Sequence, residues 1–258
     1  MRKMQKVVLI VMGIFSMILA SACGDQDKAA VEKIEQSLKE KYGEEFTVKK
    51  IGGGYGTVTT NTLKAIVSPK SAPEKEFDVE ITKDLNEVWD KYMNVVMAEK
   101  MDEVANEMAN SLFGKEVWVK SHFTSRGLLF PDNSLNDKTL NIEDYIKLNP
   151  DMDVMLDVFV KSDTAVDIDK QAQLIDQMAD ELLKEGVKYG GVSAYYVKPD
   201  TFNNMKTEYA KAEAGSELGS VIEYFSSDER SFNDSYVFIT EYKKDQSLEE
   251  IKTNLQRN

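Results

Sequence analysis

A single cysteine, Cys23, is present in the whole chain of 258 residues, so no intrachain disulfide can hold the fold together. A domain without disulfides must be stabilised by its hydrophobic core. The supply of apolar side chains is sufficient, because 42% of the residues are hydrophobic and the aromatic residues include 11 Phe and 11 Tyr. We therefore expect a folded, globular chain rather than a disordered one.

The segment before Cys23 has the three parts of a secretory signal. Three basic residues lie among the first six, an apolar block covers residues 7–20, and Ala20, Ser21 and Ala22 bring small side chains up to the cysteine. A basic start, a short apolar region and a small-residue cleavage site are typical of a signal peptide. The apolar block is shorter than the about 20 residues that a membrane-spanning helix needs, so residues 1–22 are predicted to be a leader that is removed.

The small residues directly before the cysteine resemble a bacterial lipobox, in which the cysteine receives a diacylglyceryl group. The leucine usually found three positions before the cysteine is replaced by Ala20, and Leu19 lies one position further out. Each buried methylene of an acyl chain contributes about 0.8 kcal/mol, and two chains give stable anchoring. Cys23 is therefore predicted to be the lipid anchor that holds the protein on the outer face of the cell membrane. Plain secretion and an uncleaved anchor are the alternatives.

The charge of the chain limits its partners. The formal net charge is −13, and loss of the three basic residues of the leader changes it to −16. So acidic a protein is repelled by nucleic acid and by anionic lipid headgroups. The expected partners are the membrane, through the lipid anchor, and an envelope protein or a small ligand; nucleic acid is not expected.

Helical and strand-like patterns alternate along the first half. An amphipathic helix is predicted over 29–42, with Gly43 as its end, and a long helix over 84–112, with Asp84 as its N-cap. Strand patterns separated by turn residues lie between the two helices and after them, at 45–51, 62–68, 76–82 and 116–123. The first half is thus predicted to be a helix, an antiparallel meander and a long helix.

The second half predicts a small α+β sandwich, which makes the whole chain α+β. Helices are expected at 142–149, 168–185 and 201–213 and from Ser247 onward, and strands at 152–160, 191–198, 219–225 and 235–242. A polar, Pro-containing segment at 124–141 separates this half from the first. The predicted domains are therefore an N-terminal lobe over 23–123, a connecting loop over 124–141 and a C-terminal lobe over 142–258.

Cys23 followed by "VEKIEQSLKEKYGEEFTV" and by the strands "LKAIVS" and "EFDVEI" resembles small uncharacterised lipoproteins of Gram-positive bacteria, some of them carried by prophages. The resemblance covers residues 1–112. It implies a location at the cell envelope and no particular activity.

The segment "DNSLNDKTLNIE" at 132–143 has part of the pattern of a calcium loop. Such a loop uses oxygen ligands at positions 1, 3, 5 and 12, a backbone carbonyl at position 7 and a glycine at position 6. The corresponding residues are Asp132, Ser134, Asn136, Glu143 and, at position 7, Lys138. Asp137 replaces the glycine, and a plain loop with Asn141 capping the next helix is the alternative. Calcium is the one cofactor that the sequence suggests.

Other patterns favour structural roles. The glycine-rich "IGGGYG" at 51–56 leads into a strand pattern, which indicates a turn between strands rather than a phosphate loop. The methionines of the long helix favour a core position over a binding groove. His122, the only histidine, follows Ser121 directly, so on a strand their side chains point to opposite faces and do not form a nucleophile–base pair.

No catalytic motif stands out, so a non-enzymatic binding or interaction module at the envelope is the first hypothesis. The second is an envelope hydrolase that uses the carboxylates between 151 and 169 with a divalent cation. The third is the solute-binding subunit of a transporter, although such subunits usually repeat strand–helix units in two doubly wound lobes. Cross-linking in intact cells would distinguish an abundant protein partner from a small ligand.

Overall fold

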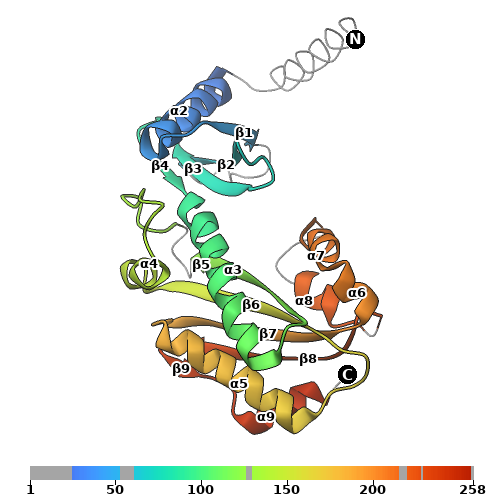
Figure 1. Ribbon diagram of the computed structural model, residues 1–258. Helices are drawn as coiled ribbons and strands as arrows, with labels where there is room; N and C mark the ends of the chain where they lie inside the picture. The colour runs from blue at the N-terminus through green and yellow to red at the C-terminus, as the bar shows by residue number, and fades with distance from the viewer. Residues whose placement is uncertain (1–24, 53–60, 126–129, 215–219, 228, 257–258) are drawn as a thin grey trace, which may run out of the picture. The chain divides into compact units, whose positions relative to one another are not determined.

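The fold is described from a computed structural model that covers residues 25–52, 61–125, 130–214, 220–227 and 229–256 (Figure 1). Cys23 and most of the glycine-rich segment lie outside these residues. Within them the chain forms eight helices, α2 to α9, and two sheets of four and five strands. This confirms the predicted α+β class. The chain divides into two compact units, Met1–Tyr92 and Met93–Asn258.

The first unit is one helix packed on an antiparallel sheet. Helix α2 (Asp25–Tyr42) is followed by the strands of this sheet in the order β1-β2-β3-β4. Their bounds are β1 Phe46–Ile51, β2 Thr62–Pro69, β3 Phe77–Thr82 and β4 Val88–Asp90. The predicted helix and meander are confirmed. The strands on either side of the glycine-rich segment, β1 and β2, are paired, and the turn predicted for that segment lies mostly outside the described residues.

Periodicity explains why this unit folds. Ala30, Ile34 and Leu38 recur every four residues and are at most 1% exposed, so they form the buried stripe of α2. On the sheet, alternate side chains of β2 and β3 point to the same core and are buried: Ala65, Val67, Phe77, Val79 and Ile81. Gly43 ends α2 with a φ of 70° and donates its N–H to the Lys39 carbonyl, which is a glycine C-cap.

The long helix begins later than predicted, and the prediction of a helix from Asp84 is wrong. Leu85 has a φ of 63°, and the Asp84 carboxylate accepts the N–H of Asn86, so this segment is a turn. Residues 88–90 then add to the sheet as β4, because Val88 and Trp89 suit a strand. Helix α3 covers Tyr92–Phe113. The Asp90 carboxylate accepts the N–H of Tyr92, the first residue of this helix.

The second unit is built on one sheet with the order β5-β6-β7-β8-β9. Its strands are β5 Val117–Ser125, β6 Met152–Lys161, β7 Tyr189–Val197, β8 Ser231–Thr240 and β9 Lys243–Lys244. Only β6 and β7 are parallel, joined by helix α5 (Ile168–Lys184), and every other neighbouring pair is antiparallel. This is the predicted strand–helix–strand unit followed by antiparallel strands.

Because β5 pairs with β6 along its whole length, β5 and α3 belong to the second unit. The division between units therefore falls between Tyr92 and Met93, ahead of the segment 124–141 that was expected to connect the lobes. That segment leads instead from β5 to helix α4 (Ile142–Leu148) within the second unit.

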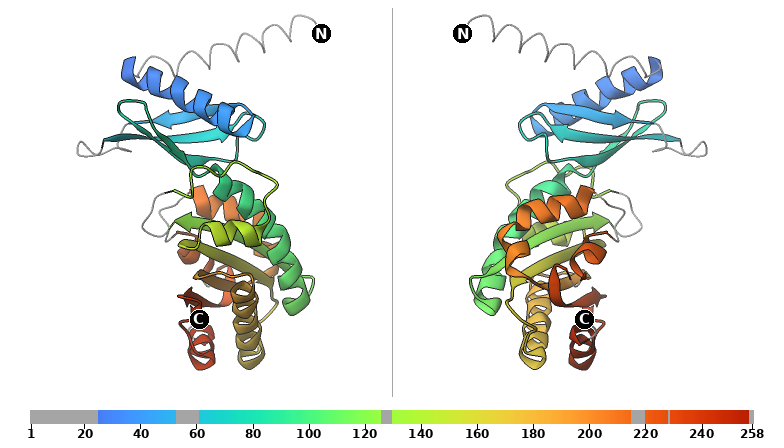
Figure 2. Two further views of the ribbon diagram at one scale, coloured as in Figure 1. Left: turned by 90° about the vertical axis from the view of Figure 1, so that its left-hand side faces the viewer. Right: turned by 90° about the vertical axis from the view of Figure 1, so that its right-hand side faces the viewer.

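The two faces of this sheet carry different helices. Val119 and Ser121 of β5 face α3, and α5 and α9 (Leu248–Leu255) pack against β8. Figure 2 shows α5 and α9 side by side. The opposite face carries Phe159 and Tyr195, which are buried against α7 (Met205–Ala214) and α8 (Ser220–Phe225). Helices α6 to α8 thus cover one face and α3, α5 and α9 the other (Figure 1).

Helix α3 also protects the outer edge of β5. Asn106 accepts the Val119 N–H at 3.0 Å and donates to the Val119 carbonyl at 3.1 Å, as a neighbouring strand would. Asp102 accepts the N–H of Ser121 at 2.6 Å. Since unpaired edge strands are sites of unwanted association, these side chains complete the sheet on this side.

Two elements of the second unit differ from the prediction. The segment 219–225 was predicted as a strand but forms α8, because Val221 and Phe225 satisfy helical spacing and Phe225 is fully buried against α7 and the sheet. The helix predicted over 201–213 is broken at Asn204 into α6 (Pro199–Asn203) and α7. Thr201 lies inside α6 rather than capping it, because Pro199 already starts the helix at its first turn.

Candidate functional site

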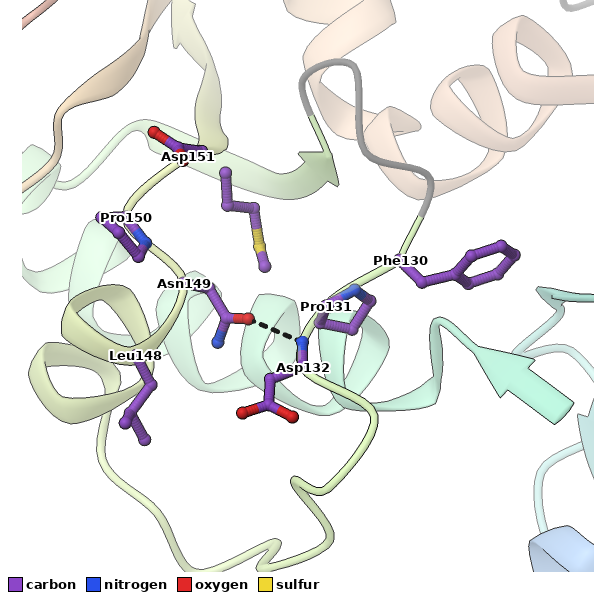
Figure 3. Close-up of a pocket in the computed structure, with 8 residues that line it drawn as sticks. Phe130, Pro131, Asp132, Leu148, Asn149, Pro150 and Asp151 are labelled. Atoms are coloured by element: carbon purple, nitrogen blue, oxygen red, sulfur yellow. Dashed lines mark hydrogen bonds between the residues drawn. The ribbon is translucent and has the colours of Figure 1, made fainter. Parts of the chain in front are cut away.

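A pocket with a volume of about 280 Å³ lies in the second unit, between two segments that precede and follow α4 (Figure 3). Its lining residues are Phe130, Pro131, Asp132, Leu148, Asn149, Pro150, Asp151 and Met152. Pockets for small ligands usually measure about 300–1,000 Å³, so this one suits a small molecule or a single side chain.

Asn149 gives the pocket its form. It is the C-cap of α4, and Pro150 prevents the helix from continuing. The Asn149 Oδ1 atom accepts the N–H of Asp132 at 3.0 Å, and its Nδ2 atom donates to the Tyr145 carbonyl at 3.0 Å. One side chain therefore joins the two segments that line the pocket.

The helix that carries one wall is itself fixed to α3. The Tyr145 hydroxyl, fully buried, donates to Asn94 Oδ1 at 2.6 Å, and Asn94 Nδ2 donates to the Phe123 carbonyl at 3.2 Å. Asn141 caps α4 by accepting the N–H of Asp144 at 2.8 Å, as predicted. Buried hydrogen bonds therefore fix α4, the helix that carries one wall of the pocket, to α3 and β5.

The walls are mainly apolar, with two carboxylates. Leu148, which is 51% exposed, lines the pocket together with other apolar residues such as Pro131 and Met152. Asp151 accepts the Lys188 ammonium at 3.0 Å, and Asp132 accepts the N–H of Ser134 at 2.9 Å. Apolar contact with a few oriented polar groups is the usual character of a binding site.

The residues of the suggested calcium loop are only partly brought together. Asp132 and Ser134 form a local turn, in which the serine hydroxyl also donates to Asp132 at 2.8 Å. Glu143 lies on α4 and pairs with Lys147 at 2.7 Å, which lowers the pKa of Glu143. Asn136 is exposed. Among the described residues, the element that precedes Asp132 is the strand β5 and not an entering helix.

In the part of the chain that the structure describes, no three His, Cys, Asp or Glu side chains lie close enough to hold a metal ion. Calcium binding by Asp132, Ser134, Asn136, Lys138 and Glu143 therefore stays a prediction of the sequence.

The carboxylates between 151 and 169 are spread over several elements. Asp151 precedes β6, whereas Asp153 and Asp157 share one face of that strand. Asp167 caps α5 by accepting the N–H of Lys170. Asp169 pairs with Lys252 at 2.9 Å.

Asp157 belongs to a polar group that the sequence did not reveal. Its Oδ2 atom lies 3.3 Å from His122 Nε2 and accepts the hydroxyl of Tyr209 at 3.1 Å, while Tyr209 and His122 are also hydrogen-bonded to each other. Because the Tyr209 hydroxyl donates to Asp157, its oxygen is the acceptor for His122 Nε2–H. Burial, followed by the nearby charge of Asp157, raises the pKa of Tyr209 far above its usual range.

Ser121 and His122 point to opposite faces, as predicted. Ser121 is 1% exposed and its hydroxyl lies 2.6 Å from Asp102 on the α3 side, while the His122 ring is 33% exposed on the other side. The predicted absence of a Ser121–His122 pair is confirmed. Tyr209 lies on α7, 87 residues after His122, and no feature of the sequence predicts its contact with His122.

Two further surfaces bear on binding. Three of the four methionines of α3 are core residues, because Met93, Met97 and Met101 are at most 1% exposed, whereas Met108 is half-buried. On β8, Tyr236 and Phe238 are 38% and 37% exposed, with ring centroids 5.0 Å apart. They form an exposed aromatic pair on the face of the sheet that α6 to α8 partly cover.

The membrane prediction lies mostly outside the described residues. Cys23 and residues 1–22 are not among them. None of the helices that the structure describes combines the length and the hydrophobicity needed to cross a bilayer.

Comparison with known proteins supports the fold alone. No protein-family model matches the chain, and no curated protein matches its sequence. The structure is similar to the crystal structure, at 2.55 Å resolution, of a DUF5037 family protein from Ruminococcus gnavus ATCC 29149. The two share 18% sequence identity and a TM-score of 0.52, over 88% of this chain and 99% of the other.

Proposed function

We propose that this chain is a membrane-anchored extracytoplasmic lipoprotein that binds a small ligand, or a side chain of an envelope protein, in the pocket beside α4. The leader and Cys23 support the proposed location at the membrane. The pocket supplies the argument for binding, because it combines a cavity with apolar walls and oriented polar groups.

The single observation that carries this proposal is the position of Asn149. Its side chain, which belongs to one lining segment, accepts the N–H of Asp132 in the other, so the two segments are joined before any ligand arrives. A preformed pocket loses less conformational entropy on binding than one assembled by the ligand. A ligand in the pocket would also contact Leu148, which lines it and is 51% exposed.

A fragment screen by ligand-observed NMR tests the binding proposal. Compounds that bind the full-length chain in detergent should lose most of their signal transfer in Leu148→Ser. Ile222→Ser is the matched control, because Ile222 is also a helical residue and is 50% exposed, against 51% for Leu148. A screen in which no compound distinguishes the two variants would contradict the proposal.

The lipid anchor is tested separately by intact mass analysis of the protein purified from its natural membrane. We expect the mass of residues 23–258 plus a diacylglyceryl group at Cys23, and loss of membrane association in Cys23→Ala. A mature protein with a free Cys23 thiol, or with the leader still attached, would contradict the anchoring proposal.

Hydrolysis is the second candidate, and the His122–Asp157–Tyr209 group favours it. A buried carboxylate that orients a partly exposed histidine is the usual arrangement of a general base. Asp157 is 8% exposed and lies 3.3 Å from His122 Nε2, which leaves Nδ1 as the other ring nitrogen. Release of nitrophenol from p-nitrophenyl acetate by the native chain, and its loss in His122→Gln, would support this candidate over pure binding.

A further inference from the structure

We infer that the N-terminal end of α2 lies against the lipid headgroups of the membrane, held there by the anchor. This inference rests on the proposed acylation of Cys23 and adds a location for the first unit. The partner is a phospholipid surface, and the part of the protein that meets it is the first turns of α2.

The length of chain between the anchor and the first helix carries the inference. Helix α2 begins at Asp25, so only Gly24 separates it from Cys23. An extended chain spans at most about 3.6 Å per residue, so the Cα atoms of Cys23 and Asp25 can be no more than about 7 Å apart. A lipidated Cys23 at the headgroup level therefore keeps the start of α2 within about 7 Å of that level.

Helix α2 is packed firmly against the sheet of the first unit, so the position of α2 also determines the position of this sheet. Ile34 and Leu38 are buried against the sheet, and the Val48 N–H donates to Glu35 at 3.1 Å. The Tyr42 hydroxyl at the far end of α2 donates to the buried Asp90 carboxylate at 2.7 Å. Movement of α2 away from the membrane would have to carry the sheet with it.

The chemistry of this end indicates that the tether, and not attraction, holds it in place. The first ten residues of α2 contain three acidic and two basic side chains, and Lys28 and Ala29 are exposed. Such a surface lacks the basic clusters and large apolar residues that bind membranes on their own. The helix N-terminus should therefore stay at the headgroups only while the short connection to Cys23 is intact.

The test uses the fact that Cys23 is the only cysteine and is blocked by acylation, so that a new cysteine is labelled specifically. A fluorophore is attached at Ala29→Cys in the full-length lipidated chain, which is reconstituted in phosphatidylcholine vesicles that contain headgroup-labelled quencher lipid. The control has 20 Gly/Ser residues inserted between Gly24 and Asp25, a linker with an average span of about 25 Å. We expect at least a twofold stronger quenching without the linker.

Equal quenching with and without the linker would overturn the inference. Flotation with the vesicles and the mass of the modification at Cys23 are measured on the same samples. A protein without acylation would contradict the proposed function, whereas a lipidated protein whose α2 lies away from the surface would contradict only this inference. Flotation of unacylated Cys23→Ala would also overturn the inference, because the protein would then have its own affinity for lipid.

Discussion

The Nε2 atom of His122 lies 3.3 Å from Oδ2 of Asp157, and the hydroxyl of Tyr209 donates to the same carboxylate oxygen at 3.1 Å. This arrangement joins β5, β6 and α7 through one buried carboxylate that is 8% exposed. Since a buried charge is costly without hydrogen-bond partners, the three residues depend on one another.

Removal of the Tyr209 hydroxyl should therefore destabilise the second unit. In Tyr209→Phe the ring keeps its contacts with Trp118 and Phe159, but Asp157 loses a donor. We expect a decrease of about 1–3 kcal/mol in the free energy of unfolding, measured by urea denaturation. Tyr242→Phe, at a residue that is 53% exposed, should change stability by less than about 0.5 kcal/mol. Equal stability of both variants would show that Asp157 does not need this donor.

Gly190 and Gly186 give a second pair of variants, one at a crowded position and one at an open position. Both have positive φ angles, of 150° and 85°. A Cβ atom at Gly190 would lie 2.0 Å from the Val154 carbonyl oxygen of the neighbouring strand, whereas at Gly186 nothing lies within 4 Å. Gly186→Ala should cost only about 1–2 kcal/mol, the usual penalty for a left-handed residue, and should fold normally.

Gly190→Ala should cost several times more, because the parallel pairing of β6 and β7 must open to admit the methyl group. Circular dichroism and soluble yield compare the two variants directly. Similar yields and melting temperatures would mean that β6 and β7 are not packed as closely as the structure has them.

The protection of the β5 edge by α3 leads to a third prediction. Asp102 accepts the Ser121 N–H at 2.6 Å and pairs with Lys120 at 2.7 Å, so Asp102→Ala leaves a strand N–H without its acceptor. We expect a loss of about 1–3 kcal/mol and faster hydrogen exchange at the Ser121 amide. Asp169→Ala is the control, because Asp169 forms an ion pair with Lys252 but its side chain is 77% exposed. Such a surface pair contributes at most about 1 kcal/mol.

Much of the fold could be predicted from periodicity. The buried stripe of α2 and the alternation in β2 and β3 are local patterns that one sequence displays clearly. The wrong predictions concern segments whose apolar spacing fits both a helix and a strand. Val221, Tyr224 and Phe225 suit a short strand as well as a helix, and contact with α7 decides between them. The start of α3 was misplaced because Val88 and Trp89 fit the helical stripe but form a fourth strand.

The candidate site was harder to predict. Pro131 and Pro150 indicated turns, and Asn141 was correctly expected to cap α4. However, the hydrogen bond from the Asp132 N–H to Asn149 depends on a side-chain orientation that no spacing specifies. The same holds for Tyr209, because a single sequence does not show which helical residue contacts Asp157 on the sheet.

The last prediction concerns pH and the first unit. Hydrogen bonds from Lys70 and Lys39, each at 2.9 Å, together with their charges, lower the pKa of Glu45 from its ordinary 4.5 to about 2. A carboxyl group whose pKa is lower in the folded state stabilises the fold above its unfolded pKa. This contribution is therefore complete above about pH 4.5 and is lost as the pH falls toward 2.

Carbon NMR titration of the Glu45 carboxyl group measures the effect. Lys70→Met should raise the pKa of Glu45 toward 4.5, and the Lys39→Met, Lys70→Met double variant should raise it further. Because the Glu45 side chain is 53% exposed, 1 M salt should also reduce the shift in the native chain. Lys91→Met, which removes a lysine paired with Asp78 in the same unit, should leave the pKa of Glu45 unchanged. An unchanged Glu45 pKa in the double variant would mean that the two lysines do not hold this carboxylate in solution.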